Sequence, residues 1–189
     1  MVTLCCTTKL LRRLRQPARL PEPPVPTNPL GEWYADLDFF ERKPFVTLLN
    51  VGTGAGLVLA GQAEFLKCLH VHAGQQLFKL LLHYDFSPEW PQCAAELSAW
   101  EAPSTYANTS DRSLLGSMNR LKLETWHRFA DGNRSLPEAA ASWWEGVFGH
   151  PSLHRSHHGS GHYHRPLDLV FDKFVPPGTV RIGYAKQLK

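Results

Sequence analysis

Polar side chains that could bind an anion are concentrated between residues 108 and 119, where a helix is expected to begin. Free N–H groups and the helix dipole at such a start favour a phosphate or a carboxylate, and Arg112 would add a forked cation. Gly116 suggests a close approach by a backbone or a ligand. The alternative is helix capping with tight packing at Gly116. The candidate residues are Asn108, Ser110, Arg112, Ser113, Gly116 and Asn119.

Histidines form a second concentration of groups able to do chemistry, within residues 150–165. Imidazole pairs at helical or strand spacing could bind Zn²⁺ or another divalent transition metal. No cysteine or acid lies among them to complete a ligand set, and Gly159-Ser160-Gly161 favours a solvated loop instead. The candidate ligands are His154, His157, His158, His162 and His164.

Basic residues cluster near the N-terminus, with no acid before Glu22. They are Lys9, Arg12, Arg13, Arg15 and Arg19. Such an arm can contact phosphates or an acidic partner, and a solvated helix face is the alternative interpretation. The formal net charge of +3 is too small to indicate nucleic-acid binding by itself.

Composition indicates an ordinary globular chain of 189 residues, which suits one domain. Its four cysteines include no CxxC pair, so we expect reduced, mostly buried thiols and a cytoplasmic protein. No apolar run is long enough to cross a membrane. Motifs typical of metalloproteases, P-loop proteins, kinases and serine hydrolases are absent from the sequence.

Hydrophobic periodicity predicts the elements that position these groups. Strands are expected near residues 2–7, 33–40, 45–51 and 56–60, with a short one within 103–109. Helices are expected over 9–15, 63–84 with a break near Gly74, 91–100, 110–129, from the capping box at Ser135 to 148, and over 167–174. Apolar positions on the 110–129 helix predict a core stripe, consisting of Leu114, Leu115, Met118, Leu121, Trp126 and Phe129.

These elements predict an α+β fold, with a small mixed or antiparallel sheet packed against several helices. Residues 1–149 form the single domain, and its six prolines at 17–29 predict an extended connector. Residues 150–165 are the His/Gly/Ser-rich loop, and 166–189 are a C-terminal helix and tail that pack on the same domain.

Several short motifs resemble those of a bacterial family of small proteins with a domain of unknown function. The hallmark is Asn108 followed by Arg112-Ser113-x-x-Gly116-Ser117-Met118-Asn119. Cys6-Thr7-Thr8-Lys9-Leu10-Leu11, with one additional threonine, and Leu30-Gly31-Glu32-Trp33-Tyr34-Ala35 are similar to the family's opening. The resemblance covers about residues 2–130. It implies a compact domain with no established activity and no catalytic residues.

The favoured hypothesis is a non-enzymatic binding or regulatory module, with no cofactor, that recognises nucleic acid or an acidic protein. It would use the start of the 110–129 helix and the basic arm. One alternative is a metal-assisted hydrolase or nuclease that uses the 150–164 histidines. Another is a structural subunit of a homo- or hetero-oligomer, because six tryptophans allow an exposed anchor.

Overall fold

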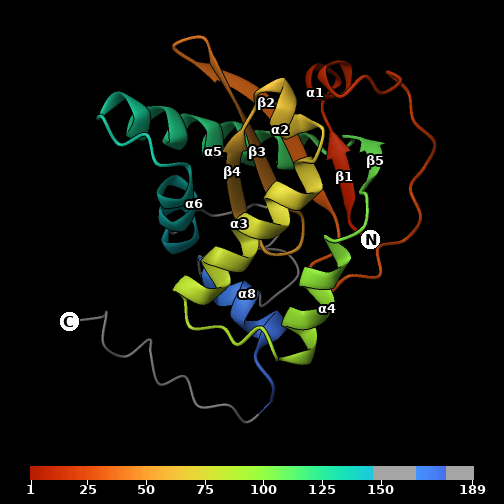
Figure 1. Cartoon of the computed structure of the whole chain (residues 1–189), viewed down its shortest axis with the longest axis vertical. Coiled ribbons are helices and arrows are strands. Elements are labelled where there is room, and N and C mark those ends of the chain that lie inside the picture. The colour runs from red at the N-terminus through yellow and green to blue at the C-terminus, as the bar shows by residue number, and fades with distance from the viewer. Residues whose placement is uncertain (147–164, 178–189) are drawn as a thin grey trace.

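A five-stranded mixed sheet forms the centre of the molecule, with strand order β4-β3-β2-β1-β5. The computed structural model describes residues 1–146 and 165–177 (Figure 1). Strand β1 is parallel to both β2 and β5, whereas β2, β3 and β4 form an antiparallel meander. The strands are β1 Thr3–Cys6, β2 Trp33–Phe40, β3 Lys43–Asn50, β4 Gly56–Ala60 and β5 Thr105–Asn108. The predicted α+β fold with a mixed sheet is confirmed.

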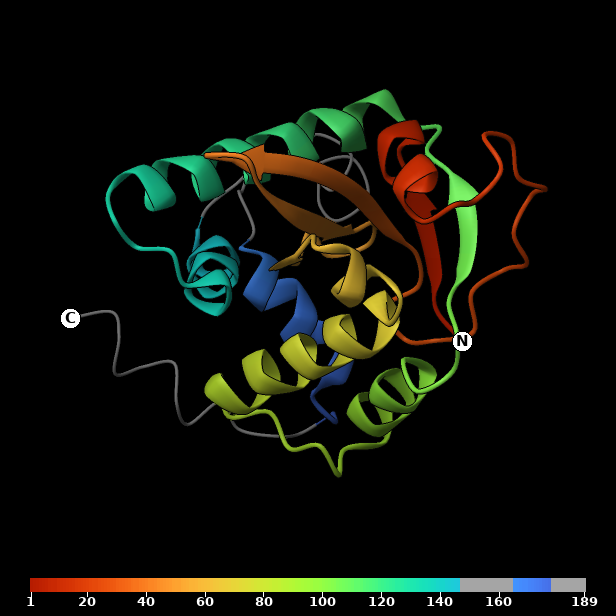
Figure 2. The ribbon, with the colours of Figure 1, turned by 45° about the horizontal axis from the view of Figure 1, so that its top comes forward.

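Helices cover both faces of this sheet (Figure 2). Successive side chains of a strand point to opposite faces, so residues of β2 contact the helices on both sides of the sheet. Trp33 packs edge-on against Trp100 after α4, and on the other face Asp36 bonds to Lys122 of α5. The helices are α1 Thr8–Arg13, α2 Ala63–Leu66, α3 Leu69–His83, α4 Pro91–Ala99, α5 Arg112–Ala130, α6 Leu136–Glu145 and α8 Pro166–Phe174.

Both ends of the proline-rich connector are held by buried or half-buried polar side chains. The Asn108 amide oxygen accepts from the N–H of Leu20 at 2.8 Å, and its nitrogen donates to the carbonyl of Ala18 at 2.9 Å. At the far end, the buried carboxylate of Glu96 accepts from the Leu30 N–H at 2.8 Å and from the Asn28 amide. Burial raises the pKa of Glu96, and hydrogen bonds from Leu30, Asn28 and Trp100 oppose that rise.

The outer edge of β4 is also covered by side chains. The Gln76 amide of α3 donates to the carbonyl of Val58 at 2.7 Å and accepts from its N–H at 2.8 Å, as a neighbouring strand would. The indole N–H groups of Trp143 and Trp144 donate to the carbonyls of Gly54 and Gly56. This edge is therefore closed to pairing with another chain.

Two local predictions were wrong. The 63–84 helix breaks at residues 67–68 and not near Gly74, which lies inside α3 where a Cβ would approach the Trp100 Cβ to 2.7 Å. Gly74 therefore allows α3 to pack closely against Trp100. On α5, Trp126 is 43% exposed and Thr125 is buried in the core stripe instead. Trp126 meets Phe40 edge-on at the surface, with ring centroids 5.5 Å apart.

The histidine candidates His154, His157, His158, His162 and His164 lie outside the described residues, as does the tail after residue 177. Within residues 1–146 and 165–177, no three metal-ligating side chains come together. In the same ranges no helix has the length and apolar character needed to cross a membrane.

Candidate functional site: a basic end of the molecule

The buried carboxylate of Asp36 lies on the central strand β2 and bonds both to Thr7, the N-cap of α1, and to α5. Its Oδ1 accepts from the Thr7 hydroxyl, next to the start of α1, and from the backbone N–H of Leu37 at 2.9 Å. Its Oδ2 lies 2.6 Å from the Lys122 ammonium of α5, and both side chains are largely buried. One carboxylate thus connects β2 with both helices. Strands β1 and β5 are parallel and end side by side, with Cys6 opposite Asn108. The helices that follow them, α1 and α5, therefore begin at the same end of the sheet.

The start of α5 uses its polar groups for internal contacts. Asp111 is the N-cap, and its Oδ1 accepts from the N–H groups of Ser113 at 2.7 Å and Leu114 at 3.2 Å. The Tyr34 hydroxyl accepts from the N–H groups of Ser110 and Asp111. The carboxylate of Asp111 therefore already provides the negative charge that the helix dipole favours.

The other candidate residues of this stretch divide into two groups. Asn108 holds the connector, and the Ser110 hydroxyl lies 3.3 Å from that of Tyr34. Arg112, Ser113, Gly116 and Asn119 are exposed on α5. The prediction of tight packing at Gly116 was wrong, because, apart from the adjoining part of α5 itself, a Cβ there would meet no atom of the described chain within 4 Å.

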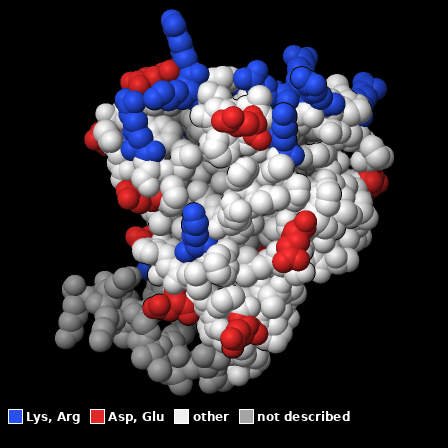
Figure 3. Space-filling view, viewed as in Figure 1, with Lys and Arg blue, Asp and Glu red and all other residues white. Residues whose placement is uncertain are grey.

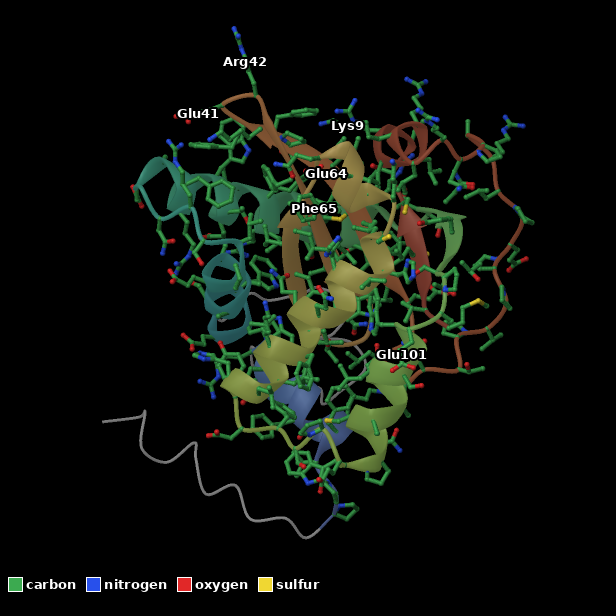
Figure 4. The ribbon with its side chains drawn as sticks, in the orientation of Figure 1. Lys9, Glu41, Arg42, Glu64, Phe65 and Glu101 are labelled. Atoms are coloured by element: carbon green, nitrogen blue, oxygen red, sulfur yellow. The ribbon has the colours of Figure 1, made fainter. Side chains whose placement is uncertain are left out.

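Cationic side chains gather at one end of the molecule, over α1 and the β2–β3 hairpin (Figure 3). We define the basic end as Lys9, Arg12 and Arg13 of α1 with Arg42 and Lys43 of the hairpin, all of which are exposed. Lys9 joins the two elements, since its ammonium lies 3.4 Å from Asp38 and 5.1 Å from the centroid of the Phe39 ring. Figure 4 shows Lys9 and Arg42 at this end, with Glu101 far below them.

Most of these cations form no ion pair with a residue of the described chain. Within the described part of the chain, Asp38 pairs with Lys9, and Glu41 pairs with Arg134 at 2.9 Å. Arg12, Arg13 and Arg42 form no ion pair in that part. Three guanidinium groups consequently remain available for an anionic partner.

The tip of the β2–β3 hairpin has an unfavourable backbone. Phe40 pairs with Lys43, so Glu41 and Arg42 form a two-residue turn, and both have positive φ angles of 46° and 65°. Such turns normally carry Asn-Gly, because other residues lose roughly 1–2 kcal/mol each in this conformation. The turn holds Arg42 outward, away from the sheet (Figure 4).

The described part of the chain contains two hollows, and only the smaller one adjoins the basic end. One, of about 220 Å³, lies beside the tip of the same hairpin and is lined by phenylalanines, Lys43 and Arg134. The other, of about 390 Å³, lies between α3 and α4 on the opposite side of the sheet from α5, with Phe78 and Trp100 in its lining. Sequence reasoning missed both, since each is assembled from segments distant in the chain.

The cysteines give this end no thiolate chemistry. Burial raises the pKa of Cys5 and Cys93 to about 12 and raises that of Cys6 further. All four cysteines are free, and only Cys68 among them is exposed. The three buried thiols therefore stay protonated at neutral pH, which makes them poor nucleophiles and poor metal ligands.

Comparison with protein-family models gives a match over residues 3–152, which is most of the chain and includes β1–β5 and α1–α6. The matching model is that of a domain of unknown function, DUF6933. The chain belongs to the DUF6933 family. The expected membership of a family without established activity is thus confirmed. A search of curated proteins found no match.

The DUF6933 match stops before α8, although α8 completes the core. Phe171 and Phe174 of α8 pack on Phe86, with ring centroids 4.3 and 6.0 Å away. The basic end and the Asp36 contacts, by contrast, lie wholly within the matched residues.

We expect Lys122→Met to lower the free energy of unfolding by roughly 3 kcal/mol, because it leaves the Asp36 carboxylate buried without its cation. Urea denaturation followed by circular dichroism measures the change. Lys79→Met on the exposed side of α3 is the matched control, with a change within about 0.5 kcal/mol. Equal stability of the two variants would show that the ion pair does not hold α5 to the sheet.

Proposed function

We propose that this protein is a non-enzymatic binding module whose basic end holds a polyanionic partner, and that the partner is nucleic acid. Support comes foremost from the hairpin tip, where two charged residues occupy a turn suited to Asn-Gly. Strain of this kind persists at functional sites, because the surrounding structure maintains it for the sake of the residue presented. Here the residue presented is Arg42.

The form of the basic end favours a nucleic-acid backbone over a small anion. Its cations come from two elements and project from an exposed surface without converging on one point. Phosphates spaced along a strand match such a distribution, and each contact releases counterions. Phe39, 36% exposed and next to Lys9, adds an aromatic surface of the kind on which bases stack.

Among the residues expected from the sequence to bind an anion, Lys9, Arg12 and Arg13 carry this proposal, together with Arg42 and Lys43. Arg112 and Asn119 are exposed on α5 and remain candidates for an extension of the same surface. Asn108 and Ser110 have a supporting part, because their hydrogen bonds fix the connector and the start of α5.

A DNA oligonucleotide of mixed sequence is expected to bind with an affinity that falls steeply with salt. Replacing Arg12 and Arg13 by alanine should weaken binding, and it should reduce the slope of log affinity against log salt by about 0.7–0.9 for each phosphate that the protein no longer neutralises. Fluorescence anisotropy between low and physiological salt measures both quantities, with Lys79→Ala as the control. Binding of poly-L-glutamate without binding of DNA would identify an acidic protein partner instead.

The double variant Glu41→Asn with Arg42→Gly should separate stability from function. We expect the free energy of unfolding to rise by about 2 kcal/mol, because the turn acquires residues suited to positive φ. The same variant should bind the oligonucleotide more weakly. Glu41→Asn alone, which keeps Arg42 and frees Arg134 from its ion pair, is the control and should bind at least as tightly as the unchanged protein. If the double variant is more stable and binds as tightly as the unchanged protein, the strained turn is not maintained for binding.

A further inference from the structure

The hollow beside the tip of the β2–β3 hairpin has a floor of aromatic rings. Phe129 of α5 meets Phe40 and Phe45 edge-on, with ring centroids 5.4 and 5.6 Å away. Gly61, at the end of β4, permits the chain to cross closely above Pro44, where a Cβ would approach the Pro44 carbonyl carbon to 2.8 Å. The resulting space of about 220 Å³ is smaller than most ligand pockets, which suits a single planar ring.

Polar groups lie only around the mouth of this hollow. Lys43 and Arg134 are exposed cations, and Gln62 is an exposed amide at the N-cap of α2. The Gln62 side chain makes no capping hydrogen bond, so both its donor and its acceptor are available. Among the described residues that line the hollow, none is acidic.

Arg134 shows how an anion would be held at this mouth. Its guanidinium lies 5.7 Å from the centroid of the Phe40 ring and 2.9 Å from the Glu41 carboxylate. Both partners of the ion pair are more than half exposed, so the pair contributes little stability and can exchange for a phosphate. Glu41 therefore occupies the place of an external anion next to an aromatic pocket.

We propose that this hollow takes one unstacked pyrimidine base of a single-stranded nucleic acid, a proposal that rests on the proposed binding of nucleic acid by the basic end. Lys43 belongs to both surfaces and follows Arg42 directly, so a strand whose phosphates contact the hairpin tip passes the mouth. The phenylalanines provide apolar and edge contacts to the ring, Gln62 bonds to its polar edge, and Arg134 exchanges Glu41 for a flanking phosphate. A base held in this way is neither paired nor stacked in a duplex.

The test compares an oligothymidylate of about ten nucleotides with a hairpin duplex of about ten mixed base pairs, which stays paired at low salt, by anisotropy. The unchanged protein should bind the single strand roughly tenfold more tightly than the duplex. Ala60→Met, which fills the hollow, should remove that preference and leave the salt slope unchanged. Ala95→Met, the same substitution at an exposed position on α4, should have no effect.

Gln62→Ala gives a second test of the pocket. This test does not depend on core packing, because Gln62 is exposed. It should weaken binding of the single strand about fivefold without changing duplex binding or the salt slope. If folded Ala60→Met and Gln62→Ala both bind the single strand as the unchanged protein does, the pocket proposal is wrong while the proposed function stands. If the unchanged protein binds neither form at low salt, the proposed function itself fails.

Discussion

The ion pair between Asp36 and Lys122 is the contact on which the arrangement of this molecule depends. A carboxylate in the middle of a sheet face is tolerated only when its charge and its lone pairs are satisfied, and Asp36 obtains this from Lys122, Thr7 and the Leu37 N–H. Each donor belongs to a different part of the chain. Because Asp36 requires all of them, α1 and α5 are held at defined positions beside β2, and the cations of α1 come to lie at the same end as the β2–β3 hairpin.

The proposed binding surface follows from that arrangement. Helix α1 has six residues and would not be stable alone, so its orientation depends on buried Leu10 and Leu11 and on the Lys9 contacts with β2. The hairpin contributes Arg42 at a turn with two left-handed residues, and the residues that flank this turn form one wall of the aromatic hollow. The hairpin thus contributes both to the charge for phosphates and to the space for a base. At the start of α5, in contrast, the Asp111 carboxylate already accepts the N–H groups that an external anion would bind.

The sequence predicted the elements well because their periodicity is local. The α+β class and the helix starts near Ser135 and Ser110 follow from short-range patterns. The features that the sequence predicted wrongly or not at all depend on tertiary contacts. Trp126 matches the apolar stripe of α5 but lies at the surface against Phe40, and Gly74 resembles a helix break but admits Trp100. Arg42, Arg134 and the phenylalanine hollow have no sequence signature, since Glu-Arg is unusual in a two-residue turn and the hollow combines four segments.

The most direct test of this account is nuclear magnetic resonance of the isotope-labelled full chain during titration with a short oligothymidylate. We expect amide shifts to change at residues 9–13, 39–45 and 134, where the basic end and the mouth of the hollow lie. The changes should decrease as salt is added, because phosphate contacts release counterions. Changes confined to the α3–α4 hollow around Phe78 and Trp100, or unaffected by salt, would contradict the assignment of function to the basic end.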